Sequence, residues 1–86
     1  MYSIDYLEVV VKKDIPALPK SHKSAIKRAI EERLSVDPIS YGKPLRYSLK
    51  GHRRLRVDDY RIVYKIVEST KKIIVTAIKH RREVYE

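Results

Sequence analysis

A chain of 86 residues is enough for one small domain, which we expect to span residues 1–86. Its 43% hydrophobic content excludes a disordered tail although 36% of the residues are charged, and the lack of cysteine excludes disulfides and thiolate metal sites. No apolar run reaches membrane-spanning length and no signal pattern opens the chain, so we expect a cytoplasmic protein.

The first 18 residues predict a strand followed by a short helix. Apolar and polar side chains alternate from Tyr2 to Tyr6, which is the period of a strand. Residues 7–18 favour a strand by propensity, yet the spacing of their apolar side chains fits a helical face equally well. We favour a short helix, with Pro16 straining its last turn.

A longer helix is expected next, from Ser21 as its N-cap to about Val36. Pro38 would stop it, and residues 37–44 are expected to form a loop. The helix would bury one narrow apolar stripe, made of Ala25, Ile26, Ala29, Ile30 and Leu34.

The rest of the chain predicts an antiparallel meander of three strands. Strand-like runs cover about 45–57, 60–68 and 72–80, and the first has a break or bulge near Gly51. Asp58 and Asp59 form a tight turn between the first two runs, and residues 68–71 close the second hairpin. The order of strand, two helices and meander predicts an α+β fold with the helices packed on one sheet face.

Positive charge is concentrated in the meander. Residues 43–82 hold 13 of the 20 Lys and Arg residues and three of the 11 acids, a net charge of +10 in a chain whose total is +9. Such a concentration is typical of a surface that holds a polyanion. A basic strand face also serves solubility and edge protection, so charge alone leaves both interpretations open.

Strand alternation distributes these cations between two sheet faces. Arg54 and Arg56 of the first run would share the outward face with Arg61 of the second. Arg81 would join them at the end of the last strand. The inward face of the second run would be Tyr60, Ile62, Tyr64 and Ile66. In the last run, strict alternation places Ile74, Thr76, Ile78 and His80 on one face and Ile73, Val75, Ala77 and Lys79 on the other.

The residue types point to RNA chemistry that needs neither a metal nor another cofactor. The sequence contains no P-loop, no nucleophilic Cys and no converging set of carboxylates. RNA carries its own nucleophile in the 2′-OH, and the arginine fork binds two phosphate oxygens at once. Histidine is the natural group for the proton transfer, and tyrosines can stack on bases. The clustered charge supports nucleic-acid binding more firmly than cleavage.

Two blocks of sequence carry a resemblance to a known family. One runs from Leu55 to Tyr64 and the other from Ile78 to Tyr85, with Pro44-Leu45 and Leu49-Lys50-Gly51 upstream. Through these blocks the whole chain resembles the RelE/ParE toxin superfamily. The resemblance implies a microbial RNase-like RelE fold and a type II toxin held inactive by an antitoxin encoded beside it.

Members that resemble RelE are mRNA interferases. The resemblance therefore implies an endoribonuclease that cleaves mRNA in the A site of the 30S ribosomal subunit through 2′-OH attack and a cyclic phosphate. The implied partners are a RelB-like antitoxin, the ribosome with its rRNA, and mRNA, but no membrane. The toxin would be a monomer or an antitoxin-bound hetero-oligomer. The alternatives are a ParE-like DNA gyrase inhibitor, a non-catalytic basic nucleic-acid-binding relative and an inactive family member.

The resemblance also assigns roles to individual residues. Arg61 matches the arginine that contacts the scissile phosphate, Arg81 the one that stabilises or protonates the leaving group, and Tyr85 the tyrosine that orients or stacks on the cleaved nucleotide. Relatives often carry two lysines where this chain has His52 and Arg54. Arginine stays protonated, so we infer that His52 or His80 takes the proton while Arg54 stabilises charge. The further RNA-binding candidates are Lys50, Arg53, Arg56, Lys79, His80 and Arg82.

Overall fold

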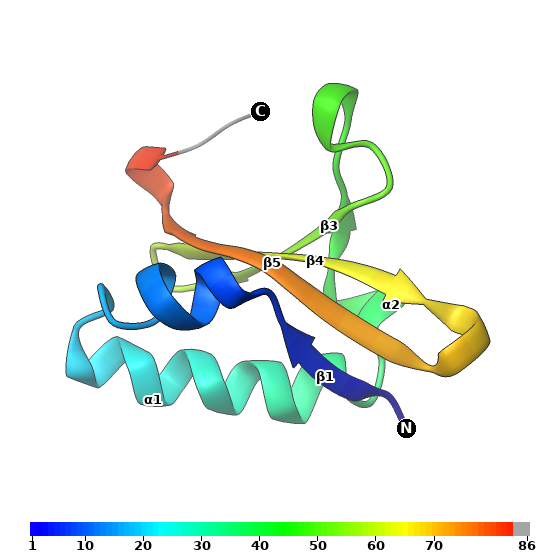
Figure 1. Cartoon of the computed structure of the whole chain (residues 1–86), viewed down its shortest axis with the longest axis horizontal. Helices are drawn as coiled ribbons and strands as arrows, with labels where there is room; N and C mark the ends of the chain where they lie inside the picture. Colours follow the sequence, from blue (N-terminus) through cyan, green and yellow to red (C-terminus); the bar gives the residue numbers. More distant parts are fainter. Residues whose placement is uncertain (84–86) are drawn as a thin grey trace.

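The computed structural model describes residues 1–83, apart from the side chain of Ser48, and shows a five-stranded sheet with helices on one face (Figure 1). β1 runs parallel to β5, and every other neighbouring pair is antiparallel. The predicted α+β order of strand, helices and antiparallel meander is confirmed. In sheet order the strands are β1 (Ser3–Tyr6), β5 (Lys72–His80), β4 (Tyr60–Val67), β3 (Arg53–Val57) and β2 (Lys43–Pro44).

Two tight turns connect the meander strands at the predicted places. Asp58 has a φ of 54° between β3 and β4, a left-handed conformation that Asp adopts more readily than most residues. The turn between β4 and β5 contains the 3-10 helix η4 (Glu68–Thr70) and ends at Lys71, whose φ is 50°.

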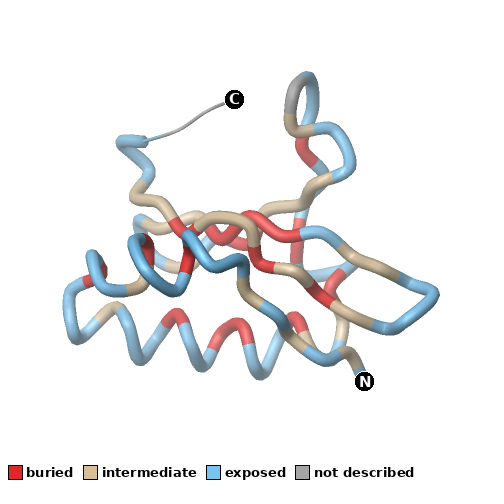
Figure 2. The backbone as a smooth tube through the Cα atoms, viewed as in Figure 1, coloured by how far each residue is buried: buried red, intermediate tan, exposed pale blue. Residues whose placement is uncertain are grey.

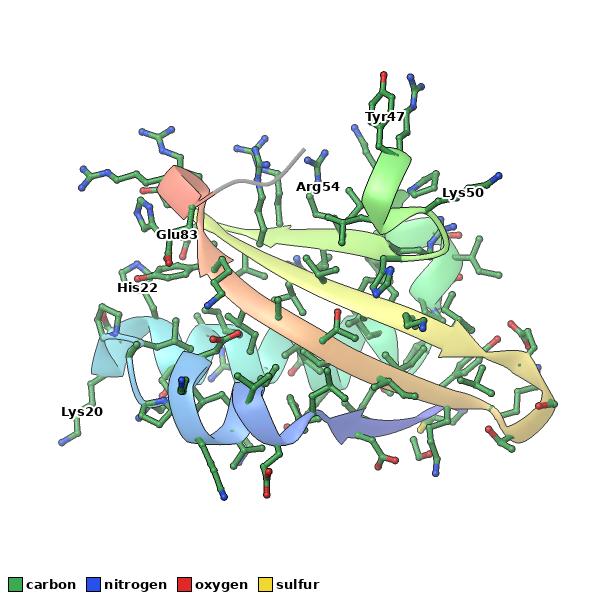
Figure 3. The ribbon with its side chains drawn as sticks, turned by 45° about the horizontal axis from the view of Figure 1, so that its top comes forward. Lys20, His22, Tyr47, Lys50, Arg54 and Glu83 are labelled. Carbon is green, nitrogen blue, oxygen red and sulfur yellow. The ribbon has the colours of Figure 1, made fainter. Side chains whose placement is uncertain are left out.

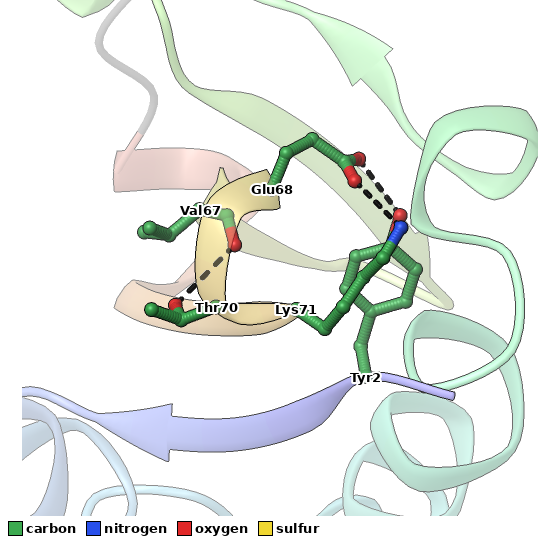
Figure 4. Close-up of polar contacts among 5 residues, drawn as sticks. All are labelled: Tyr2, Val67, Glu68, Thr70 and Lys71. Carbon is green, nitrogen blue, oxygen red and sulfur yellow. Dashed lines mark hydrogen bonds and ion pairs between the residues drawn. The ribbon is translucent and has the colours of Figure 1, made fainter.

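Glu68 ties this second turn to the N-terminus. Lys71 donates from Nζ to Glu68 Oε1 at 2.9 Å, and Tyr2 donates from its hydroxyl to Oε2 at 2.7 Å (Figure 4). The hydrogen bond from Lys71, followed by the one from Tyr2, holds the pKa of Glu68 below its usual value. The contact fixes the start of β1 beside the β4–β5 hairpin.

A short helix follows β1, as predicted. The π-helix η1 covers Val10–Asp14, and the N–H of Ile15 donates to the carbonyl of Val10, five residues earlier, at 2.8 Å. The expectation that Pro16 strains the last turn is wrong, because the helix ends at Asp14 and Ile15 is its C-cap.

The long helix consists of α1 (Lys20–Ala29), which continues into the π-helical segment η2 (Ile30–Leu34). The predicted N-cap Ser21 is wrong: Pro19 holds that position, and its carbonyl accepts the N–H groups of His22 and Lys23 at 3.0 and 2.9 Å. Pro19 has a non-helical ψ of 147°, so the helical backbone begins at the next residue, Lys20. No helix within residues 1–83 is long and apolar enough to cross a membrane.

Residues 37–57 depart most from the prediction of a loop followed by a strand-like run, although the break that we expected near Gly51 is confirmed. The side chain of Asp37 accepts the N–H of Ser40 at 3.1 Å, and this cap starts the short helix α2 (Pro38–Tyr41) where a loop was expected. The expected strand at 45–57 is present only as β3. Positive φ angles at Tyr47 (57°) and Gly51 (93°) break the extended backbone, and the 3-10 helix η3 (Tyr47–Leu49) lies between them.

The core lies between the long helix and one face of the sheet, where the buried segments gather (Figure 2). The predicted helical stripe is confirmed except at Ala25, which is exposed. The core cluster joins Val10, Leu18, Ile26, Ala29, Ile30 and Leu34 to the sheet residues Leu55, Ile62, Tyr64, Ile73, Val75 and Ile78.

A bulge changes which β5 side chains face the core. Val63 pairs with Ala77 but Tyr64 pairs with Val75, so Thr76 is an extra residue on β5. Strict alternation along β5 is therefore wrong, although the predicted inward face of β4 is confirmed by its packing in the core. Val75 and Ile78 both lie in the core, although alternation had placed them on different faces. The residues after the bulge have therefore exchanged faces relative to those before it.

Candidate nucleic-acid interface

Three strands place cations in one row on the face opposite the long helix. Arg56 of β3 pairs with Arg61 of β4, and Arg61 pairs in turn with Lys79 of β5. Side chains directly opposite each other on neighbouring strands share a face and lie close together. Like charges directly opposite each other destabilise a sheet unless other groups compensate them. We call these residues and the adjacent Arg54 the cation row.

Arg54 stands two residues before Arg56 on β3 and therefore shares its face. Figure 3 shows Arg54 projecting from the sheet on the side away from the long helix, which is also the side of Tyr47 and Lys50. Tyr47 is 86% exposed and has a positive φ, which is uncommon for a bulky residue. Sequence reasoning missed Tyr47. Its position in a cationic loop, between Arg46 and Lys50, is the signal that could have found it.

Arg81 lies next to the β3–β4 turn, at one end of the cation row. It begins the 3-10 helix η5 (Arg81–Glu83), and its N–H donates to the carbonyl of Asp59 at 2.7 Å. Its Nε lies 3.7 Å from Asp59 Oδ1, and its side chain is 61% exposed. An exposed pair at this distance contributes little to stability, so the guanidinium can exchange Asp59 for a phosphate at low cost. Arg82 is exposed in the same segment.

Lys79 is held by a buried carboxylate that sequence reasoning did not single out. Asp14 at the end of η1 accepts from Lys79 Nζ at 2.9 Å and from the N–H of Ile78 at 2.9 Å. The Asp14 side chain is 3% exposed, against 33% for Lys79. Asp14 therefore joins η1 to the part of β5 that lies beyond its pairing with β1, and it fixes one end of the cation row.

His80 lies on the opposite face from Arg61. It pairs with Tyr60, whose ring packs against the core, and the two ring centroids are 5.2 Å apart. His22 of α1 stacks on the other side of this contact, 5.1 Å from Tyr60. The N–H of Arg82 donates to His80 Nδ1 at 3.2 Å. The sheet therefore separates His80 from the cation row, and its assignment as the base stays a prediction.

His52 is the second candidate base, and its backbone is fixed at the start of β3. Its N–H donates to the carbonyl of Leu49 at 2.9 Å, and its own carbonyl accepts the N–H of Leu45 at 2.9 Å. The half-buried side chain has a buried Nδ1 with no hydrogen-bond partner among the described residues. Strand alternation gives His52 the same face as Arg54.

Arg53, which we predicted to bind RNA, directs its guanidinium to the backbone of α2 and not to the cation row. It shares the core-side face of β3 with Leu55, and its Nη2 donates to the carbonyls of Ile39 and Gly42 at 2.8 and 3.0 Å. Tyr64 donates beside it to the carbonyl of Pro38 at 2.5 Å, and burial raises the pKa of this phenol. Arg53 and Tyr64 thus attach α2 to the sheet.

The arrangement can bind phosphates but offers no assembled metal site. Within residues 1–83 no three His, Asp or Glu side chains come together to hold a metal ion. The remaining predicted catalytic residue, Tyr85, lies outside the described residues. The structure brings together the cation row and His52 on one face, and Arg81 lies beside the β3–β4 turn just after β5.

Comparisons with known proteins agree with one another. The sequence profile of the family described as "ParE toxin of type II toxin-antitoxin system, parDE" matches residues 7–85. Toxin RelG of Mycobacterium tuberculosis is 30% identical over 74 residues, covering 86% of this chain and 85% of that protein. Toxin RelE of the same organism is 32% identical over 73 residues, covering 85% of this chain and 75% of that protein.

Solved structures repeat the fold. The toxin–antitoxin complex RelBE2 of Mycobacterium tuberculosis contains a chain that matches with a TM-score of 0.86 and 28% identity, over 93% of this chain and 98% of that one. The intact RelBE complex of E. coli matches with a TM-score of 0.77 and 20% identity, over 93% and 96% of the two chains. At that identity the second match shows the fold alone.

Proposed function

Since the chain belongs to the RelE/ParE toxin family of type II toxin–antitoxin systems, we propose that it is a ribosome-dependent endoribonuclease that cuts mRNA without a metal. The observation that carries this proposal is the cation row. Arg56 and Arg61 face each other across neighbouring strands, with Arg54 beside them on β3. A phosphodiester placed over the row would offset their mutual repulsion and receive bidentate contacts.

The chemistry uses the nucleophile that RNA provides. The 2′-oxygen bonds to the adjacent phosphorus while the bond from phosphorus to the 5′-oxygen breaks, leaving a cyclic phosphate. Arg61 and Arg54 stabilise the charge that builds on the phosphoryl oxygens, and fixed cations act most strongly where charge develops. Arg81 stabilises the departing 5′-oxygen, which takes its proton from solvent.

His52 accepts the proton of the 2′-OH in this scheme. The structure supports His52 over His80 because only His52 shares the face of Arg54. Its Nδ1 is buried, which leaves Nε2 as the accepting atom. General-base catalysis of this kind contributes roughly 10²–10⁴-fold to the rate.

The ribosome supplies the positioning that this small surface lacks. One exposed sheet face with a few cations can neutralise phosphates, but it cannot by itself hold a single strand with its 2′-OH in line. Contacts between the remaining positive charge and rRNA would provide affinity and a fast association rate. Free RNA is then a poor substrate. The same charge suits an acidic RelB-like antitoxin as the inhibiting partner.

A ParE-like gyrase inhibitor is the second candidate function. The observation that favours it is the matched family profile, whose description names ParE, together with the replacement of both strand lysines by His52 and Arg54. This candidate predicts a DNA-damage response and intact mRNA when the toxin is induced.

Arginine variants and a modified substrate test the proposal. Arg61→Ala and Arg81→Ala should each abolish mRNA cutting by translating ribosomes supplied with the purified toxin, while the circular dichroism spectrum stays that of the unaltered protein. Arg28→Ala, which removes an exposed charge from α1, is the matched control and should cut normally. A single 2′-deoxynucleotide at the cut position should block cleavage. Cutting that survives either arginine change would remove that residue from the mechanism.

A further inference from the structure

A second cationic site lies at the edge of the sheet, beside the cation row. β2 pairs with β3 only at Arg53 and Arg54, so the rest of β3 has no neighbouring strand on that side within residues 1–83. A hollow of about 430 Å³ occupies this place between the helices and the strand edge. Its lining comes from η2, α2, β2 and β3, through Arg33, Tyr41, Lys43, Arg54, Leu55 and Arg56.

The charge of this hollow is entirely of one sign. Four of its six lining residues are Arg or Lys and none is acidic. Arg33, Lys43 and Arg56 are exposed residues that reach it from three different elements. Cations that converge from separate elements onto one concavity raise the local concentration of anions, since their fields add there. The hollow is therefore built for an anion with more than one charged oxygen.

An aromatic ring completes the lining. Tyr41 is 52% exposed, and it follows directly on the segment of α2 that Arg53 and Tyr64 attach to the sheet. An exposed ring on a fixed element offers a surface on which a base can stack. The volume lies in the range of small-molecule sites, and Leu55 is the only aliphatic side chain in the lining, so little is present to seat the apolar anchors of a peptide.

We propose that this edge pocket binds a nucleotide that flanks the one cut on the cation row. Arg33 and Lys43 neutralise its phosphates, and Tyr41 stacks on its base. Arg54 and Arg56 line the pocket and also belong to the cation row, so one RNA strand can pass from one site to the other without leaving positive surface. This inference rests on the proposed function for the identity of the strand as RNA.

The test measures binding without cleavage. A short single-stranded RNA whose 2′-OH groups are all methylated cannot be cut, and its affinity is measured from low to physiological salt. Arg33→Ala should weaken binding and reduce the slope of log K against log salt by about 0.7. Tyr41→Ala should weaken binding roughly fivefold to a hundredfold with the slope unchanged. Arg28→Ala removes the same charge from the same long helix outside the pocket, and we expect its affinity to stay near that of the unaltered protein.

The outcomes separate this inference from the proposed function. If Arg33→Ala and Tyr41→Ala bind the RNA as Arg28→Ala does while the unaltered toxin still cuts mRNA on ribosomes, the edge pocket is not a nucleotide site and the nuclease proposal stands. If the two variants instead lose affinity only for a co-expressed acidic protein, the pocket is a protein-docking site and the inference is wrong. Lack of saturable RNA binding by the unaltered protein at low salt would also overturn it.

Discussion

At the scale of single residues, Asp14 shows how this small protein places a charge inside without leaving it unpaired. Its carboxylate is almost fully buried, yet it meets one N–H of a strand edge and one ammonium group. Burying an unpaired carboxylate is costly, so both contacts are needed. They hold Lys79 in the cation row and close the part of β5 that β1 leaves uncovered.

Substitutions at Asp14 should separate these two contacts. Asp14→Ala leaves the Ile78 N–H and the Lys79 ammonium without an acceptor, and we expect a loss of about 3 kcal/mol in the free energy of unfolding. Asp14→Asn keeps an acceptor oxygen for Ile78 and should lose about half as much. Urea unfolding at neutral pH measures both. Equal stability of the two variants and the unaltered protein would show that the buried contact carries no weight.

His52, just before β3, and His80, at the end of β5, lie on different faces of the sheet. His52 shares a face with Arg54, whereas His80 packs on Tyr60 behind the sheet. If His52 is the base, cleavage of ribosome-bound mRNA should require a side chain at position 52 that can accept a proton.

His52→Gln should lower the cleavage rate roughly 10²-fold or more, because an amide cannot take the proton of the 2′-OH. His80→Gln is the matched control, and it should keep the rate of the unaltered protein. Single-turnover rates of cleavage on ribosomes provide the measurement. A rate that falls with His80→Gln and is kept by His52→Gln would assign the base the other way.

At the scale of elements, α2 is positioned by a close approach of the sheet. Gly42 ends this helix, and a Cβ added to it would lie 1.7 Å from the hydroxyl oxygen of Tyr64 and 2.7 Å from the ring carbon that carries it. Glycine is required here because the Tyr64 hydroxyl occupies the space of a side chain. The same phenol bonds to Pro38, so one contact sets the distance between α2 and β4.

Gly42→Ala should therefore destabilise the fold by about 2 kcal/mol or more, since neither the helix nor the buried ring can move away freely. Tyr64→Phe removes the nearest clashing atom and the hydrogen bond to Pro38. The double variant Gly42→Ala/Tyr64→Phe should lose clearly less than the sum of the two single losses. Thermal or urea unfolding of all four proteins completes the cycle. Additive losses would show that the close approach is not the cause.

The elements also show where sequence patterns suffice. Alternation predicted the inward face of β4 correctly. The turns that contain Asp58 and Lys71 were predicted from the polar residues between the strand-like runs. The Thr76 bulge was not predictable, because a bulge depends on pairing between two strands and leaves no mark in the pattern of one. It reverses the faces of the β5 residues that follow it, and this is why strand alternation alone could not place His80 relative to the cation row.

The candidate site was predicted in part for the same physical reason. Arg54, Arg56 and Arg61 lie on short regular strands, so alternation alone assigned them one face. Arg53 was assigned to RNA although its guanidinium serves α2, and that contact spans residues far from it in sequence. The contacts of Asp14 and the lining of the edge pocket depend on how distant segments meet, which the local sequence does not encode.

At the scale of the whole molecule, the hydrophobic core and the cation row lie on opposite faces of one sheet. The long helix and the core cover one face and supply the stability. The other face carries the cation row, with the loop of Tyr47 and η5 rising from the sheet on either side of it (Figures 1 and 3). Such a surface suits phosphates of any nucleic acid, so under the proposed function selectivity for mRNA on the ribosome would come from the larger complex.

Mapping the 5′ ends of cellular mRNA after brief induction of the toxin tests the proposed nuclease function most directly. We predict new ends inside translated codons within minutes, their absence from untranslated regions, and their loss with Arg61→Ala. Growth arrest by the unaltered protein with mRNA intact and the DNA-damage response switched on would contradict it.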